Sequence, residues 1–203
     1  TWLIQDVLQP MRALYLRMPA VATLVLAVGA GYLIGGIRSA LVVAALTLFI
    51  ALSPWWDRAL VTLYMATFGV VISCLIGFTV GTLCFQNKKS AAFMLGVCDI
   101  FQTFPSFVYL IPVMMLFGIT DTSVLIAVIV YATIPATRYT IEGLRSVPVG
   151  LHEAATMSGV NKFQRLTKIE FPLAFPHMML GLNQTIVFAL FMVIIGAFIG
   201  TED

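Results

Sequence analysis

The chain has 203 residues, of which 61% are hydrophobic and only 10% are charged, and its mean hydropathy is +1.03. Soluble domains are about 45–50% apolar and about 25% charged. This composition excludes a water-soluble fold, because such a fold could not bury so much apolar surface. The net charge of +2 gives no indication of a nucleic-acid partner. No polar stretch is long enough for a second, soluble domain, so we expect one membrane domain.

Six hydrophobic segments follow one another along the chain, and a membrane-spanning helix needs about 20 mostly apolar residues. The segments cover residues 20–37, 40–53, 59–85, 91–118, 123–137 and 172–199. Only Arg38 and Ser39 separate the short second segment from the first. The fourth contains Pro105 and Pro112, which we expect to interrupt its helix. The pattern predicts an all-α, polytopic transmembrane helical bundle, with an N-terminal segment at 1–58 that carries two hydrophobic helices and a core at 59–203.

The positions of the 11 Lys and Arg residues predict the orientation, since cytoplasmic loops are enriched in both. With the loop after Phe85 inside, eight basic residues are cytoplasmic and three are external. The cytoplasmic ones are Arg38, Lys88, Lys89, Arg138, Arg145, Lys162, Arg165 and Lys168, and the external ones are Arg12, Arg17 and Arg58. The opposite orientation would invert this ratio. The polar loop at 146–171 is therefore predicted to be cytoplasmic.

Two small-residue pairs, Gly31–Gly35 and Gly77–Gly81, have the four-residue spacing that lets helix backbones approach closely. We expect them to pack helices within one chain.

The loop at 146–171 is the only long polar segment and predicts two short helices with a break between them. Pro148 suits a helix start, and Gly159 can end the first helix in the left-handed conformation. Asn161 can cap the second helix, with Gln164 at capping-box spacing. We expect Pro172 to stop that helix and turn the chain into the membrane.

Three functions can be compared for such a loop. A rigid helix parallel to the membrane can dock in a cleft of a separate motor protein, with Glu153 as a charged anchor and Ala154 and Ala155 as a flat face. An amphipathic interfacial helix with no protein partner has the same pattern. A helix-turn-helix DNA reader is disfavoured because membrane segments tether both ends. The physical pattern alone leaves the first two readings open.

The spacing within the loop resembles the EAA signature of permeases in binding-protein-dependent ABC importers. The matching positions are Glu153, Ala154, Ala155, Gly159, Ile169 and Pro172, and Phe171 stands where leucine is usual. The resemblance implies a MetI-like permease fold in a bacterial inner membrane, working by alternating access. It also implies a cytoplasmic pair of ATPase subunits that use Mg-ATP, a second permease half, and an external or periplasmic binding protein. We expect the two permease halves to form a homodimer, although the sequence does not distinguish it from a heterodimer.

A second resemblance covers roughly residues 56–200. The runs at 99–112, 115–119, 181–185 and 189–199 are similar to the glycine betaine/proline betaine permease branch. This resemblance implies an osmolyte substrate such as glycine betaine, choline, carnitine or trimethylamine N-oxide. The ending at 199–203 resembles a point where relatives continue into one more helix, so we expect the permease core to extend further.

Several residues are candidates for a substrate path. Aromatic faces attract quaternary ammonium groups, and broken helices often line transport paths. The candidates are Phe101, Phe104, Phe107 and Tyr109 around Pro105, together with the polar Asn183 in the last segment. Packing of the aromatic residues and interhelical hydrogen bonding of Asn183 are the alternatives. Asp99 is an acid within a hydrophobic segment, and we expect it to pair with a basic loop residue.

The sequence contains no P-loop motif, and we find no catalytic constellation and no metal-ligand spacing. We therefore expect a non-catalytic transport subunit with no cofactor of its own, and ATP hydrolysis by a partner. An ion-coupled secondary transporter or channel, or a membrane scaffold that does not transport, is the alternative. Either alternative requires no ATPase.

Overall fold

The computed structural model describes residues 9–199, and within that range it contains helices and no strands. The prediction of an all-α fold is confirmed. The chain divides into two compact units, Thr1–Met65 and Ala66–Asp203, with the boundary inside helix α3 (Trp56–Phe85). The ending at 200–203, where we expect the chain to continue, lies outside the described residues.

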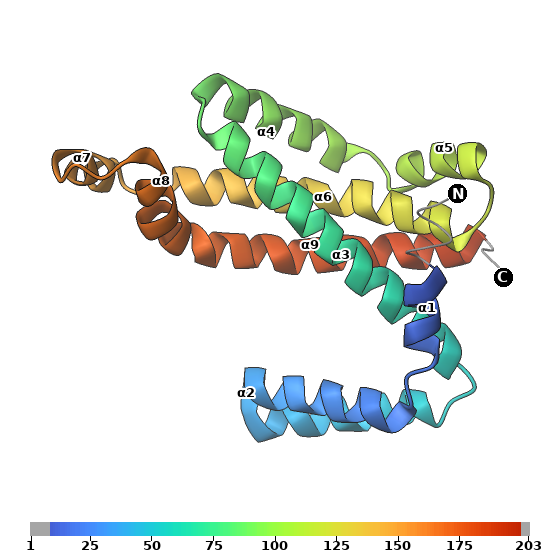
Figure 1. Cartoon of the computed structure of the whole chain (residues 1–203). Helices are drawn as coiled ribbons and strands as arrows, with labels where there is room; N and C mark the ends of the chain where they lie inside the picture. Colours follow the sequence, from blue (N-terminus) through green and yellow to red (C-terminus); the bar gives the residue numbers. More distant parts are fainter. Residues whose placement is uncertain (1–8, 200–203) are drawn as a thin grey trace. The chain divides into compact units, whose positions relative to one another are not determined.

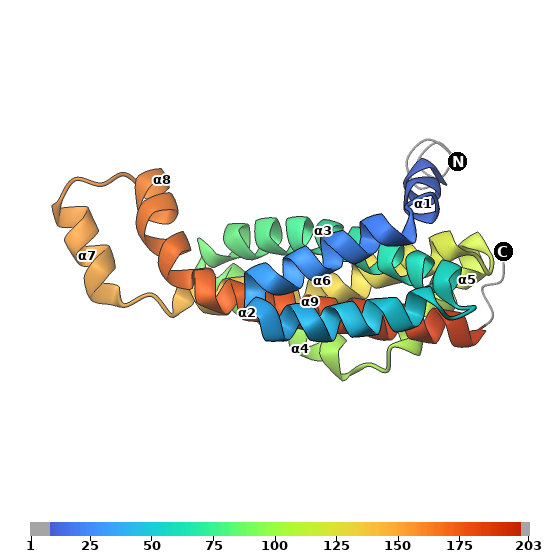
Figure 2. The same cartoon turned by 90° about the horizontal axis from the view of Figure 1, so that it is seen from below.

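The first unit contains α1 (Gln9–Leu16) and α2 (Ala20–Ala51). Helix α2 is broken at Gly35 and Gly36, and Gly36 has φ +67°, a conformation that glycine adopts at little cost. A methyl group on Gly31 would lie 3.1 Å from Cγ2 of Val43. In a straight helix these two residues would be about 18 Å apart, so the two arms of α2 fold back on each other (Figures 1 and 2).

The two hydrophobic segments predicted at 20–37 and 40–53 are therefore the two arms of α2. The predicted break at Arg38 and Ser39 is wrong by three residues, because the reversal requires a positive φ that Gly36 supplies. Each arm has about fifteen residues and is about 22 Å long. That length is shorter than the hydrocarbon core of a bilayer, which is about 30 Å thick.

In the second unit, α3, α6 (Asp121–Arg145) and α9 (Phe171–Ile199) pack through small residues. A methyl group on Gly81 of α3 would lie 2.7 Å from Cβ of Thr140 in α6. A methyl group on Gly181 of α9 would lie equally close, at 2.7 Å, to Cβ of Tyr139. Helices α6 and α9 run side by side over much of their length (Figure 1). The packing role predicted for the Gly77–Gly81 pair within one chain is confirmed.

The segment predicted at 91–118 is a bent pair of helices, α4 (Lys88–Thr103) and α5 (Phe107–Phe117), whose axes differ by 86°. The break lies at Pro105, as predicted, whereas Pro112 lies inside α5 without ending it. Residues 9–199 contain four helices long and apolar enough to cross a membrane when α2 is counted at its full 32 residues across its break, and five spans if the α4–α5 pair counts as one.

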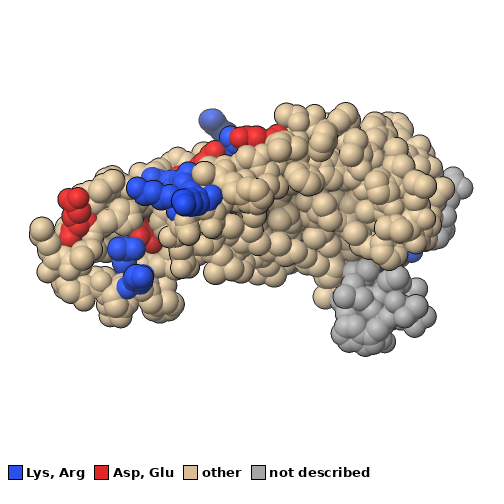
Figure 3. All heavy atoms as spheres, turned by 90° about the horizontal axis from the view of Figure 1, so that it is seen from above, with Lys and Arg blue, Asp and Glu red and all other residues tan. Residues whose placement is uncertain are grey.

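The start of α4 and the end of α6 lie at the same end of the second unit, because Nη2 of Arg145 donates a hydrogen bond to the Lys88 carbonyl at 3.2 Å. The predicted topology requires this arrangement. Lys and Arg side chains gather toward that end, over the elements next to α7 (Val149–Met157) and α8 (Lys162–Arg165) (Figure 3).

Candidate functional site

The polar loop folds as the sequence predicts at its first helix. Helix α7 starts directly after Pro148 and ends at Met157, and the N–H of the capping residue Ser158 donates to the Ala154 carbonyl at 3.0 Å. Gly159 follows with φ +71°, the left-handed conformation expected of it. The N–H of Val160 then bonds back to the Ala155 carbonyl at 3.1 Å. These bonds satisfy carbonyls at the end of α7 and fix the direction in which the chain leaves it.

The predicted capping box at Asn161 is confirmed. Oδ1 of Asn161 accepts a hydrogen bond from the Gln164 N–H at 2.8 Å, and Oε1 of Gln164 accepts one from the Asn161 N–H at 3.2 Å. Two N–H groups that have no partner within a helix are satisfied in this way.

The predicted role of Pro172 is wrong. A continuous helical rod runs from Lys162 to Ile199, and Pro172 is the second residue of α9 inside it. A π-helix, η2 (Leu166–Glu170), precedes the proline, and the Phe171 N–H reaches the Leu166 carbonyl five residues back. Because proline lacks an N–H, the wider π turn shifts the hydrogen bonds by one residue and lets the helix continue.

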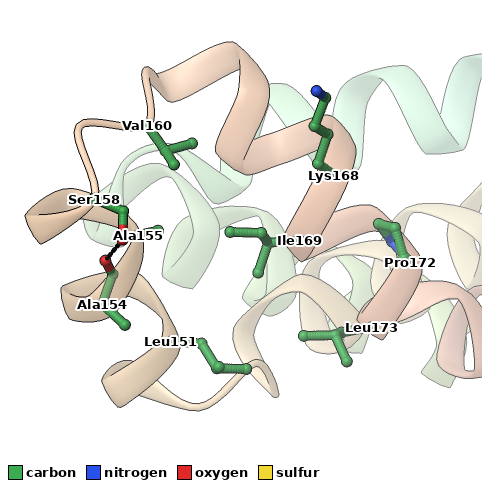
Figure 4. A pocket seen from close by; sticks show the side chains of 9 residues that line it. All are labelled: Leu151, Ala154, Ala155, Ser158, Val160, Lys168, Ile169, Pro172 and Leu173. Atoms are coloured by element: carbon green, nitrogen blue, oxygen red, sulfur yellow. Dashed lines mark hydrogen bonds between the residues drawn. The ribbon is translucent and has the colours of Figure 1, made fainter.

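The six residues of the signature are not equivalent in the structure. Glu153, Ala154 and Gly159 are exposed, whereas Ala155 is buried. An open groove of about 540 Å³ lies between α7 and the rod, with Ala154 and Ala155 on its α7 side and Ile169 and Pro172 on the rod side (Figure 4). The remaining side chains that line the groove are Leu151, Ser158, Val160, Lys168 and Leu173, so the lining is mostly apolar. Only Ala154 of the alanine pair thus lies on the outer surface.

The sequence reasoning missed Glu170, whose side chain is only 2% exposed. Its Oε1 accepts a hydrogen bond from Nε of Arg165 at 2.9 Å and lies 3.1 Å from Nδ1 of His152. A signal for it was present, because an acid between Ile169 and Phe171 in an apolar run needs a partner if it is buried. The partner on α7 lies 18 positions earlier, and no helical spacing connects the two.

Asp99 pairs with Arg138 of α6, a helix residue and not the loop residue that we expected. Arg138 also donates to Oε1 of Glu142 at 3.0 Å and to Oε1 of Gln102 at 3.2 Å. The side chain of Asp99 is 60% exposed and that of Arg138 is 28% exposed. This network joins the bent pair α4–α5 to α6.

Three of the four predicted aromatic residues form a connected series. The Phe101 ring lies 6.2 Å from Phe104 and 6.0 Å from Tyr109, and the Tyr109 hydroxyl donates to the Phe101 carbonyl. The series continues through two residues that the sequence reasoning missed, Tyr131 at 5.0 Å from Tyr109 and Phe188 stacked at 4.6 Å on Tyr131. It therefore joins α4, α5, α6 and α9.

The other two candidates lie apart from this series. Phe107 is exposed, and within residues 9–199 no ring contact joins it to the other aromatics. Asn183 is exposed, and its side chain has no hydrogen bond to a described residue. Among the described residues there is also no group of three His, Cys, Asp or Glu side chains that could hold a metal ion.

Comparison with known proteins agrees with this arrangement. Residues 69–203 match the family described as binding-protein-dependent transport system inner membrane component. The trimethylamine N-oxide transport system permease protein of Pelagibacter ubique is 90% identical over 203 residues, which is 100% of this chain and 28% of that protein. The corresponding protein of Ruegeria pomeroyi is 47% identical over 97% of this chain and 30% of its own length.

A more distant relative is the glycine betaine/proline betaine transport system permease protein of Escherichia coli, which is 33% identical over 97% of this chain and 55% of that protein. The chain thus spans less than a third of the length of the two trimethylamine N-oxide permeases and about half of the length of the betaine permease.

Proposed function

Because this chain belongs to the family of binding-protein-dependent transport system inner membrane components, we propose that it forms part of the permease of an ATP-driven importer for trimethylamine N-oxide. The observation that supports trimethylamine N-oxide as the substrate is the 90% identity to a trimethylamine N-oxide permease along the whole chain. Related betaine-like osmolytes form the substrate class, since a betaine permease is a more distant relative.

The same proposal gives α7 the role of the coupling helix. Two cytoplasmic ATPase subunits grip α7 in each of two identical permease copies, and an external binding protein delivers the substrate. ATP is hydrolysed with Mg²⁺ in the ATPase and not in this chain. The support is that α7 is a short helix with defined ends, with Glu153 exposed as an anchor and Gly159 turning the chain sharply away.

The aromatic series is the proposed weak contact for substrate during transit. A trimethylated nitrogen carries positive charge on its methyl groups, and the faces of aromatic rings attract such a cation. Phe101 and Phe104 are partly exposed beside the break at Pro105, whereas Tyr131 and Phe188 stack closely on each other. We therefore assign first contact to Phe101 and Phe104. Phe107 and Asn183 remain candidates for a second contact on the same path.

The direct test is uptake by the full-length permease, reconstituted in liposomes with its ATPase and binding protein. Labelled trimethylamine N-oxide should accumulate only with Mg-ATP inside, and labelled glycine betaine and choline measure the breadth of the substrate class. Accumulation without ATP that follows an ion gradient would contradict the proposal and support a secondary transporter.

The coupling role is tested by Gly159→Ala, with Gly96→Ala in α4 as the control. At φ +71° an alanine is strained by about 1–2 kcal/mol, so the exit from α7 should change and uptake per ATP should fall several-fold. Gly96 has no atoms within 4 Å of an added methyl group and no positive φ, and it lies outside α7. Its variant should transport as the unmodified protein does. Equal uptake by both variants would contradict the coupling role of this turn.

A further inference from the structure

Glu170 differs from most other charged residues of the polar loop at 146–171. Glu153, Lys162 and Lys168 are exposed, whereas the carboxylate of Glu170 is 2% exposed and engages both Arg165 and His152 through Oε1. A buried carboxylate without partners is strongly disfavoured, so these contacts determine where its neighbours lie. We name Glu170, Arg165 and His152 the Glu170 cluster.

The Glu170 cluster connects α7 to the rod, which the chain itself joins only through the short segment 158–161. His152 belongs to α7, while Arg165 and Glu170 belong to the rod Lys162–Ile199 that continues into the membrane. Among the described residues, His152 and Glu170 are the only basic and acidic side chains that lie within 4.0 Å of each other across α7 and the rod.

Apolar packing does not make this connection alone. The groove of about 540 Å³ lies between Leu151 and Ala155 on α7 and Ile169 and Leu173 on the rod, so these faces are separated over part of their length (Figure 4). Close packing is what lets neighbouring helices move together. Where the apolar faces are open, the polar contacts of Glu170 remain as the fixed link.

We propose that Glu170 is a positioning residue that makes α7 and the rod move as one body, so that a tilt of α7 becomes a tilt of α9. This inference rests on the proposed function of α7. Its assignment to Glu170 is new, because Glu170 lies outside the six signature positions. Glu153 and Gly159 serve contact with the motor, whereas Glu170 transmits the resulting displacement into the membrane.

The first test measures position without transport, by hydrogen exchange in the purified full-length protein. In Glu170→Gln, backbone amides at 149–157 should exchange about tenfold faster, while those of α6 stay unchanged and show that the helices remain folded. Glu153→Gln removes one negative charge from the same loop at an exposed site and should leave exchange at 149–157 unaltered. Equal exchange in the two variants would overturn the inference.

The second test measures coupling in the reconstituted importer. Glu170→Gln should lower the trimethylamine N-oxide imported per ATP several-fold while the amount of co-purified ATPase stays unchanged. Arg165→Gln should give the same pattern, because it removes the other firm partner of Glu170. Glu153→Gln should instead reduce the amount of ATPase recovered. Unchanged import per ATP in Glu170→Gln would overturn the positioning role.

The two tests separate the inference from the function on which it rests. An unmodified importer that takes up none of the tested osmolytes overturns the proposed function. The exchange measurement then decides alone whether Glu170 holds α7 against the rod.

Discussion

The polar loop at 146–171 and the membrane helices that it connects are held together by different forces. Between α7 and the rod, the polar contact of His152 with Glu170 lies beside an open and mostly apolar groove. Between α3, α6 and α9, glycines let the backbones approach until an added methyl group would clash. Around the loop, water favours the burial of apolar side chains. Between the membrane helices this driving force is missing, because lipid tails are as apolar as the side chains that would be buried. The membrane helices therefore depend on shape, and the loop depends on individual polar contacts.

The largest expected effect is a loss of stability when a larger side chain disrupts the close packing of α3 against α6. Gly77→Val places a side chain against Ala136 and within 2.9 Å of the Thr137 backbone nitrogen. Backbone atoms cannot move aside easily, so the variant should lose about 3 kcal/mol of stability. The thermal unfolding midpoint of the full-length protein in detergent measures this loss.

The matched control for this change is Gly96→Val in α4. An added methyl group at Gly96 meets no atom within 4 Å, so the same exchange of residue types should leave the midpoint nearly unchanged. If both variants unfold at the same temperature, the close approach of α3 to α6 is not what stabilises the bundle.

The contrast also explains how far the sequence could predict the structure. The ends of α7, the capping box and the break at Pro105 depend on residues within a few positions of each other, so local chemistry was sufficient. The role of Pro172 was wrong because its effect depends on a π turn that begins at Leu166. Such a shift of hydrogen bonds has no residue signature.

Contacts between distant segments were the least predictable. Glu170 and His152 share no helical spacing, and Tyr131 and Phe188 join the aromatic series only because α5, α6 and α9 meet. We expected the partner of Asp99 in a loop, but its partner is Arg138 in helix α6. Several basic residues of the second unit could have been placed close to Asp99 by the packing of the helices. Which of them lies there depends on how α4 crosses α6, and the sequence pattern contains no crossing angle.

The Asp99–Arg138 pair is a polar contact between helices that otherwise pack through small residues, so it tests whether a polar contact also stabilises the membrane region. Asp99→Asn should destabilise the protein by at most about 1 kcal/mol, because the pair is partly exposed and Arg138 keeps Glu142 as a second acceptor at 3.0 Å. A double-mutant cycle with Arg138→Gln, followed by thermal unfolding, measures the coupling between the two side chains. Strictly additive effects would mean that the pair does not hold α4 to α6.

The smallest expected effect belongs to the capping box in the loop. Asn161→Ala removes the side-chain oxygen that accepts from the Gln164 N–H, and loss of such a cap costs about 1 kcal/mol. Asn161 is exposed and the box is local, so water can replace part of the lost bond and the packing of α6 on α9 is untouched. The loss should therefore appear as faster hydrogen exchange at 162–165 with little change in the global midpoint. Asn161→Ser keeps an acceptor at the same position and should restore most of the protection, whereas equal exchange in both variants would show that the cap contributes nothing to this end of the rod.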